Sequence, residues 1–337
     1  MSPTLVIVVP CFNEEEVLPE TSKRLRSLVH DLSTDGLISA ESHVLFVDDG
    51  STDATWHQIV EHSQEGTEIR GVKLSRNRGH QNALLAGLHF ADGDAVVSID
   101  ADLQDDIEVI RTMVERFSEG SDIVYGVRRR RDVDSGFKRH TAEGYYRLLS
   151  ALGVEVVYNH ADYRLLSRRA LETLKQYEEV NLFLRGVVPT LGYRSTVVEY
   201  DRAERFAGES KYPLKKMLAL ALDGVTSFTA LPLRFIAGLG IAVFLVSLAI
   251  SFWALSVRLF TDSAVPGWAS SVLPMYLLGG IQLLGIGVVG EYVAKIYMET
   301  KRRPRFIIEE TVPRGAVASD ENTAPPVRIE AVRGTHS

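Results

Sequence analysis

The sequence predicts an α/β fold with a mostly parallel sheet, followed by an interfacial helix and a pair of membrane-spanning helices. Three observations lead to this prediction. Short β-rich runs alternate with helical patterns through about residue 127, polar side chains gather where those runs end, and two long uncharged runs follow near the C-terminus. Alternation of this kind is typical of βαβ units, which place helices on both faces of a parallel sheet.

The alternating part contains five expected strands and four expected helices. The strands are Leu5–Val9, Val44–Val47, Arg70–Leu74, Ala95–Ile99 and Ile123–Tyr125. The helices between them are Glu15–Leu32, Ala54–Gln64, Gln81–Ala91 and Ile107–Phe117. Ligands of such sheets bind at the carboxyl ends of the strands.

Polar clusters occupy four of those carboxyl ends. They are Asn13-Glu14-Glu15, Asp48-Asp49-Gly50-Ser51, Arg76-Asn77-Arg78-Gly79-His80 and the aspartates that follow Ile99. Four clusters at one edge of a sheet are hard to explain as four unrelated turns, so we expect a binding site there.

The most informative cluster is the pair Asp100 and Asp102, followed by Gln104. Side chains alternate along a strand, so positions i and i+2 point the same way. Two hard oxygen ligands at a strand end suit Mg²⁺ or Mn²⁺, and such an ion would neutralise a diphosphate leaving group. The alternative is a strand-end turn rich in Asp.

Composition narrows the possible partners. The 337 residues are enough for about two domains, and the net charge of −7 argues against nucleic-acid binding. A single cysteine, Cys11, excludes an intrachain disulfide. We see no signal peptide at the N-terminus, so we expect the catalytic part to stay in the cytoplasm.

Two uncharged runs predict a transmembrane hairpin. Phe235–Val257 and Ala264–Gly290 each exceed the roughly 20 residues that cross a bilayer as a helix. Basic residues flank the runs and Arg258 alone lies between them, so the positive-inside rule places both termini in the cytoplasm. The second run is rich in glycine, which permits close helix packing and a homo-oligomer.

Residues 214–225 carry an apolar stripe with helical spacing, and Lys215 and Lys216 lie off that stripe. This pattern favours a helix in the membrane interface, and a helix packed on the catalytic domain is the alternative. We therefore divide the chain into a cytoplasmic catalytic domain (1–210), an interfacial segment (211–234), two transmembrane helices (235–297), and a cytoplasmic basic segment with a disordered tail (298–337).

Several motifs together resemble family 2 glycosyltransferases of the polyprenyl-phosphate type, which include bactoprenol glucosyltransferases and dolichol-phosphate mannose synthases. The motifs are Pro10–Glu15, Asp48–Ser51, Leu74–Ala83, Asp100–Gln104, Asn159–Leu165, Glu204–Tyr212 and the C-terminal hairpin. Asp106 and Arg78 depart from the residues usual in that family.

The resemblance implies a GT-A, Rossmann-like fold and assigns roles to named residues. It implies that Pro10, Phe12, Glu14, Asp48 and Asp49 bind the nucleotide. It implies that Asp100, Asp102 and Gln104 form the metal and diphosphate site, and that Arg205 and Lys211 contact the donor diphosphate. By family position, Arg128 and Arg139 would bind the acceptor phosphate. The planar guanidinium group of Arg suits this role because it can bind two phosphate oxygens.

The resemblance makes Asp162, beside Arg164, the candidate catalytic base. A lipid phosphate has a second pKa of about 6, so it is largely ionised near neutral pH and needs little proton abstraction. Asp162 would then position the acceptor, or hold Arg164 through an ion pair.

The resemblance implies an inverting, membrane-anchored enzyme that uses Mg²⁺ or Mn²⁺ to move a sugar from a nucleotide-sugar, UDP-glucose by the bactoprenol branch, to polyprenyl phosphate. The product would serve cell-envelope glycan modification at the plasma (inner) membrane. The alternatives are a GDP-mannose enzyme like the dolichol-phosphate mannose synthases, a processive polysaccharide synthase, and an inactive membrane scaffold.

Overall fold

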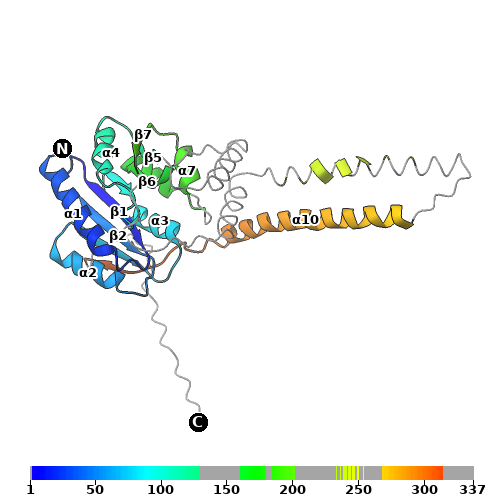
Figure 1. Ribbon diagram of the computed structural model, residues 1–337, viewed down its shortest axis with the longest axis horizontal. Helices are drawn as coiled ribbons and strands as arrows, with labels where there is room; N and C mark the ends of the chain where they lie inside the picture. The colour runs from blue at the N-terminus through cyan, green and yellow to red at the C-terminus, as the bar shows by residue number, and fades with distance from the viewer. Residues whose placement is uncertain are drawn as a thin grey trace, which may run out of the picture.

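The computed structural model describes residues 2–129, 160–179, 184–201 and 268–313, together with scattered helical positions between 233 and 253. Figure 1 shows a sheet domain and a long helix that runs away from it. The helices are α1 Leu18–Thr34, α2 Thr55–Glu65, α3 His80–Phe90, α4 Val109–Ser118, α6 Arg168–Lys175, α7 Leu184–Thr190 and α10 Trp268–Thr300.

The described strands form one sheet in the order β7-β5-β6-β4-β1-β2-β3-β8. Their bounds are β1 Leu5–Cys11, β2 His43–Asp48, β3 Ile69–Leu74, β4 Ala95–Ser98, β5 Ile123–Arg128, β6 His160–Ser167, β7 Ser195–Tyr200 and β8 Ile308–Val312. The first four strands pair in parallel around β1, while β6 and β8 run antiparallel to their neighbours. The expected mostly parallel sheet is confirmed.

Two apolar cores cover the two faces of the sheet. One contains the buried sides of α1, α2 and α4, and the other contains those of α3, α6 and α7. Strand β1 contributes alternate side chains to both, since neighbouring residues of a strand point to opposite faces. Burial on both faces explains why the parallel strands read as continuous apolar runs.

Strand β6 was not among the expected strands, because its sequence carries charges among its apolar residues. It lies between β4 and β5 and aligns Leu165 and Leu166 with both neighbours. The ends of β6 are polar: Asp162 lies near its start, and Ser167 caps α6 by accepting a hydrogen bond from the backbone N–H of Ala170.

Strand β8 lies within the segment 298–337, where no strand was expected. It returns from α10 to the catalytic sheet and pairs antiparallel with β3. The indole N–H of Trp56 donates to Glu310 at 3.2 Å, and the backbone N–H of Ser75 donates to the carbonyl of Ile307 at 2.9 Å. The edge of a sheet presents unpaired backbone N–H and C=O groups that can pair with another strand. This pairing uses backbone atoms, so the side-chain pattern of residues 308–312 did not reveal the strand.

The first uncharged run falls largely outside the described residues, and the second overlaps α10. Within the part of the chain that is described, we find no helix that combines the length and the apolar character needed to cross a bilayer. The predicted interfacial stripe at 214–225 lies outside the described residues.

Candidate active site

The loops after β1 and β2 are joined to each other at the carboxyl edge of the sheet. The backbone N–H of Asn13 donates to Ser51 Oγ at 3.0 Å, and Asn13 Oδ1 accepts from the backbone N–H of Thr52 at 2.9 Å. Glu15 Oε2 accepts from the backbone N–H of Ala54 at 2.8 Å. This network holds Phe12 at the edge with 43% of its surface exposed, although large apolar side chains usually lie inside.

Asp48 and Asp49, both predicted to bind nucleotide, are buried at the end of β2. Asp48 accepts from the backbone N–H of Ser51, and Asp49 accepts from those of Arg78 and Gly79 at 2.7 and 2.8 Å. Burial raises the pKa of both carboxyls. These bonds shape the loops of the site, and direct contact of either carboxylate with a nucleotide stays a prediction.

The bonds to Asp49 bring the loop before α3 against the loop after β2. Gly50 lies at this contact with a φ of +68°, and a Cβ there would come within 2.6 Å of the backbone of Arg76. Only glycine fits such a close approach in the left-handed region. The loop ends at Gly79, and α3 begins at His80, whose Nε2 lies 3.4 Å from Asp100 Oδ1 after β4.

Asp100 and Asp102 follow β4 at the same edge. The backbone N–H of Gln104 donates to Asp102 Oδ1 at 3.2 Å, and Leu103 between them takes a positive φ of 54°. Burial, together with the neighbouring carboxylates of Asp105, Asp162 and Asp102, raises the pKa of Asp100 to about 6, although His80 opposes the shift. Crowded hard oxygen atoms of this kind suit a divalent cation, which would relieve their repulsion.

Within the described ranges, no three His, Cys, Asp or Glu side chains form a complete metal-ligand group. Mg²⁺ is commonly held by one or two carboxylates plus the phosphates of a substrate, so the aspartate pair fits that mode of binding. A protein cage that holds an ion without substrate is not present among the described residues.

Asp162 lies at the start of β6 between two arginines. Arg164 Nη2 donates to Asp162 Oδ1 at 2.5 Å, and Arg185 Nη2 donates to Asp162 Oδ2 at 2.8 Å. Burial alone would raise the pKa of Asp162, but His80, Arg185 and Arg164 outweigh it and hold that pKa well below its usual range. A carboxylate with so low a pKa is a weak base, which favours the positioning role over proton abstraction.

His80 connects the two acidic positions. Its Nε2 lies 3.4 Å from Asp100 Oδ1 and 3.7 Å from Asp162 Oδ2. Burial lowers the pKa of His80, and the carboxylates of Asp162 and Asp100 more than offset this, so the pKa is raised. His80 therefore brings Asp100 and Asp162 close together at this edge of the sheet, and their shared catalytic role stays a prediction.

Arg128, predicted to hold the acceptor phosphate, has other partners here. Its Nη2 donates to Asp105 Oδ1 at 3.0 Å, and the hydroxyl of Tyr200 donates to the same oxygen at 2.6 Å. Asp105 is buried, so these bonds tie the loop after β4 to the ends of β5 and β7. Contact of Arg128 with a phosphate stays a prediction, while Arg139, Arg205 and Lys211 lie outside the described residues.

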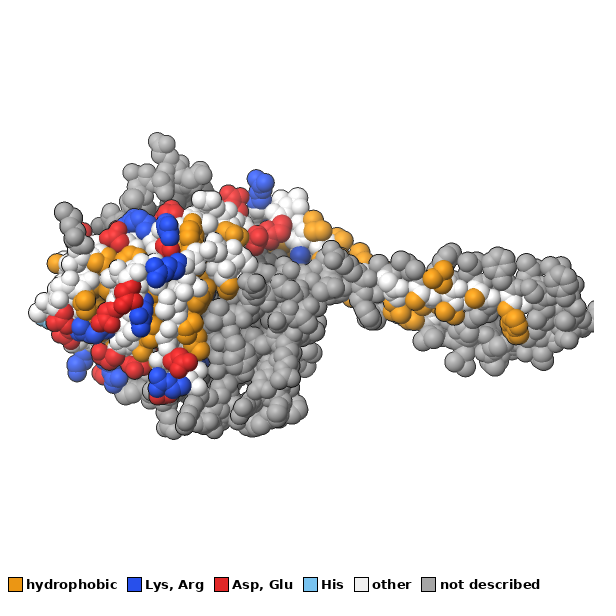
Figure 2. All heavy atoms as spheres, turned by 90° about the horizontal axis from the view of Figure 1, so that it is seen from above, with side chains coloured by type: hydrophobic (Ala, Val, Ile, Leu, Met, Phe, Trp, Pro, Cys, Tyr) orange, Lys and Arg blue, Asp and Glu red, His pale blue; other side chains and the backbone are white. Residues whose placement is uncertain are grey.

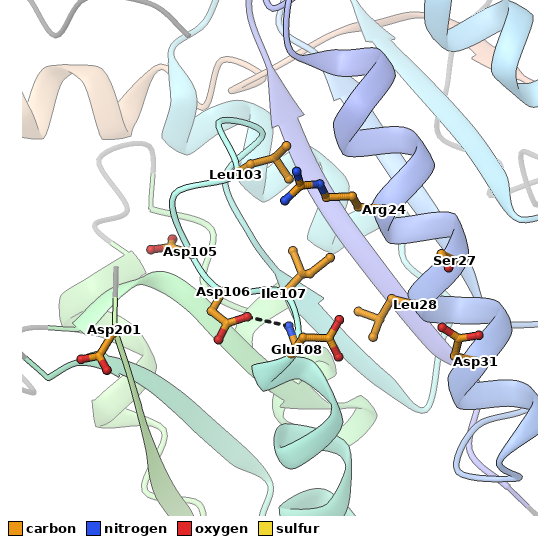
Figure 3. A pocket seen from close by; sticks show the side chains of 10 residues that line it. All are labelled: Arg24, Ser27, Leu28, Asp31, Leu103, Asp105, Asp106, Ile107, Glu108 and Asp201. Atoms are coloured by element: carbon orange, nitrogen blue, oxygen red, sulfur yellow. Dashed lines mark hydrogen bonds between the residues drawn. The ribbon is translucent and has the colours of Figure 1, made fainter. Parts of the chain in front are cut away.

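A hollow of about 550 Å³ opens beside this loop, with α1 as one of its walls (Figure 3). Its charged lining is mostly acidic: Asp31, Asp105, Asp106, Glu108 and Asp201, with Arg24 as the basic member. An acidic wall repels a diphosphate. The hollow lacks Asp100 and Asp162, so we do not assign it to the donor.

Sequence reasoning missed the contacts that Arg185 and His80 make with Asp162. Arg185 follows the apolar run Leu182–Leu184, and a charge next to apolar residues is rarely buried unless it is paired, which is the one signal the sequence offered. His80 was placed in an edge cluster, but its contact with two different strand ends depends on the fold.

The family model described as "Glycosyl transferase family 2" matches residues 6–175. The chain belongs to this family. It is therefore a glycosyltransferase, and the resemblance that its motifs show is confirmed. Similarity to two relatives extends beyond the residues that the family model matches.

The chain is 53% identical over 309 residues to the "Uncharacterized glycosyltransferase YkoT" of Bacillus subtilis, which covers 91% of each chain. It is 40% identical over 304 residues to the "Prophage bactoprenol glucosyl transferase homolog" of Escherichia coli, covering 90% of this chain and 97% of that one. Among solved structures, glucosyl-3-phosphoglycerate synthase from Mycobacterium tuberculosis aligns with a TM-score of 0.45 and 23% identity, covering 66% and 76% of the two chains.

Proposed function

We propose that this enzyme transfers glucose from UDP-glucose to polyprenyl phosphate at the plasma (inner) membrane, and so supplies a lipid-linked sugar for cell-envelope glycan modification. One observation carries the proposal: the 40% identity to a bactoprenol glucosyl transferase homolog spans 97% of that relative, including the region after the family domain. The arrangement of charges at the carboxyl edge of the sheet supports it.

In the proposed reaction a phosphate oxygen of the acceptor attacks the anomeric carbon while the bond from that carbon to the donor diphosphate breaks, with inversion. Asp100 and Asp102, with Gln104, would hold Mg²⁺ or Mn²⁺, which would supply positive charge for the leaving diphosphate. Asp162 accepts no proton in this scheme, because two guanidinium groups keep it ionised and the acceptor phosphate is already largely a dianion.

The donor side of the site is formed by the loops after β1 and β2. Phe12 is the exposed aromatic there, and it offers a ring face on which a nucleotide base can stack. Pro10, Glu14, Asp48 and Asp49 then act as the residues that shape and line the nucleotide position.

The donor is tested by incubating the purified full-length enzyme with undecaprenyl phosphate and radiolabelled UDP-glucose, UDP-GlcNAc or GDP-mannose, and measuring label in the lipid extract. We expect label from UDP-glucose and none when the acceptor is omitted. Transfer of label to the lipid from GDP-mannose alone would support the mannose-synthase alternative and reject UDP-glucose as the donor. No transfer of label from any of the three donors would reject both.

We also propose that the segments Phe235–Val257 and Ala264–Gly290 form a membrane hairpin. Apolar side chains are exposed on the projecting part of the molecule (Figure 2). The exposed large apolar residues among the described positions of the two segments are Leu245, Val246, Trp253, Met275, Ile286 and Val289. Exposed apolar surface of this extent is typical of contact with a membrane or a partner.

Cysteine labelling of intact cells measures the orientation. The native Cys11 is buried, so a cysteine placed by Ser263→Cys or Asp320→Cys is the accessible one. We expect an impermeant maleimide to label Ser263→Cys and to spare Asp320→Cys. Several basic residues follow the second run and a single one, Arg258, lies in the loop, so the positive-inside rule places the loop outside the cytoplasm. Labelling of Asp320→Cys with protection of Ser263→Cys would reverse the orientation.

A further inference from the structure

The loop between β4 and α4, residues 99–108, carries the candidate metal ligands. Figure 3 shows Leu103, Asp105 and Asp106 along this loop. Leu103 has a φ of 54°, in the left-handed region that residues with a Cβ rarely adopt. Such backbone costs free energy and persists when the surrounding structure holds it in place. The hydrogen bond from Gln104 to Asp102 lies inside the loop, and further contacts come from outside it.

Two buried tyrosines from other strands contact the end of this loop. The hydroxyl of Tyr200 on β7 donates to Asp105 Oδ1 at 2.6 Å, and the hydroxyl of Tyr163 on β6 donates to the backbone carbonyl of Asp106 at 2.8 Å. The two rings pack edge to face, with their centroids 5.3 Å apart. This is a favourable arrangement of aromatic rings, so the pair holds its two hydroxyls against consecutive residues of the loop.

The contacts converge on Asp105, whose carboxylate is buried. Arg128 Nη2 on β5 donates to the same Oδ1 at 3.0 Å, so Asp105 joins the loop to β5 as well as to β7. A buried carboxylate is costly unless donors surround it. An apolar side chain of similar volume is often at least as stabilising, so stability alone does not account for an aspartate at this position.

The place of Asp105 in the chain indicates what it does. It directly follows Gln104, and Asp102 precedes both in the same loop. Consecutive Cα atoms are held about 3.8 Å apart, so a shift of Asp105 moves Gln104 with it. Groups outside the ligand set of a metal site orient the ligands and contribute to the affinity for the ion.

We propose that Tyr200 and Tyr163 are positioning residues of the metal site. Through Asp105 and Asp106, their hydroxyls hold the loop in the shape that binds a divalent ion together with the donor diphosphate. The inference rests on the proposed function for the presence of a metal and a nucleotide-sugar. Tyr200 lies outside the sequence motifs that predicted the site, so the inference adds β7 to the elements that support it.

Tyr200→Phe tests the inference, because it removes the hydroxyl and keeps the ring. Mn²⁺ binding to the full-length enzyme in detergent is measured with saturating UDP, from the electron paramagnetic resonance signal of the free ion. We expect the Kd for Mn²⁺ to rise roughly tenfold, the lower end of the loss that follows removal of such a supporting group. The number of ions bound per chain should equal that of the parent, since the ligands remain.

Amide hydrogen exchange of the metal-free enzyme gives a second readout, which needs no ion. Loss of the hydroxyl contact should let the loop open more often, so we expect faster exchange within residues 99–108 of Tyr200→Phe. Exchange in α2, which packs beside β3, should match that of the parent.

Tyr193→Phe is the matched control. The Tyr193 hydroxyl is hydrogen-bonded to Thr173 Oγ1 at 2.7 Å, and Tyr193 precedes β7, at the opposite end of that strand from Tyr200. This variant loses a hydroxyl contact away from the site, so we expect the Mn²⁺ affinity of the parent. If Tyr200→Phe does not fold, Tyr163→Phe replaces it in both measurements, since that change removes the bond to the loop and keeps the ring.

Parent-like Mn²⁺ affinity in a folded Tyr200→Phe would overturn the inference, as would an equal loss of affinity in Tyr193→Phe. A lower affinity without faster exchange in the loop would also overturn it, because the loss would then arise elsewhere. So would a parent that binds no Mn²⁺ in the presence of UDP.

Sugar transfer by the parent is measured separately. A parent that binds Mn²⁺ and UDP but transfers no sugar to the lipid would reject the proposed function. A loss of Mn²⁺ affinity confined to Tyr200→Phe, with faster exchange in the loop, would still support the positioning role of the tyrosines.

Discussion

Asp102→Asn should abolish sugar transfer and leave the protein folded. The Asp102 carboxylate accepts a hydrogen bond from the backbone N–H of Gln104, and an Asn side-chain carbonyl can accept the same bond. The negative charge is lost, however, and with it the attraction for a divalent ion beside the leaving diphosphate. Metal stabilisation of such charge amounts to several kcal/mol, so we expect a loss of about a hundredfold or more in turnover.

Turnover and melting temperature of the variant decide this prediction. Asp92→Asn is the control, because Asp92 is an exposed carboxylate on the loop that precedes β4, at the opposite end of the strand from Asp102. EDTA should inhibit the parent and Mn²⁺ or Mg²⁺ should restore it. Full activity of the parent in EDTA would reject the assignment of a required metal ion to this site.

Asp162→Asn should lower both stability and rate. It leaves Arg164 buried beside a neutral amide and frees Arg185 from its anchor. Removing one partner of a buried pair costs about 3–5 kcal/mol, since the remaining charge is uncompensated. The free energy of unfolding from urea titration measures this loss.

The double variant Asp162→Asn/Arg164→Met separates stability from positioning. Replacing both charges of a buried pair is often nearly neutral, so we expect unfolding free energy to recover towards that of the parent. The rate should stay low, because the carboxylate that would position the acceptor is still absent. Recovery of the rate together with stability would mean that Asp162 serves the fold alone.

The pH dependence follows from the depressed pKa of Asp162. A carboxyl whose pKa is lowered on folding contributes its stabilisation above its unfolded pKa, about 3.9, and loses it as the pH falls through the folded value. The pair is therefore intact at neutral pH.

The residual rate of Asp162→Asn should climb through about pH 6 with the second ionisation of the acceptor phosphate. A flat rate near zero from pH 5.5 to 8.5 would instead support a catalytic base.

Strands β1 to β4, which pair in parallel, were predictable from the sequence, because they are largely buried on both faces and read as apolar runs. The helices between these strands were predicted to within a few residues of their bounds. Strands β6, β7 and β8 were not expected. Asp162 and Arg164 interrupt β6, Glu309 and Glu310 interrupt β8, and β7 leaves one face exposed. Their pairing partners lie far away in the sequence, so local pattern carries little information about them.

The sequence by itself determined that acidic and polar groups meet at one edge, because parallel strands joined by helices must end on the same side. Which charges pair there was decided only by the tertiary structure. Asp162 pairs with Arg185 of a separate helix, and Arg128 pairs with Asp105 across the sheet edge. Ion-pair choice depends on distances of a few ångströms between elements, and the packing of the two cores sets those distances.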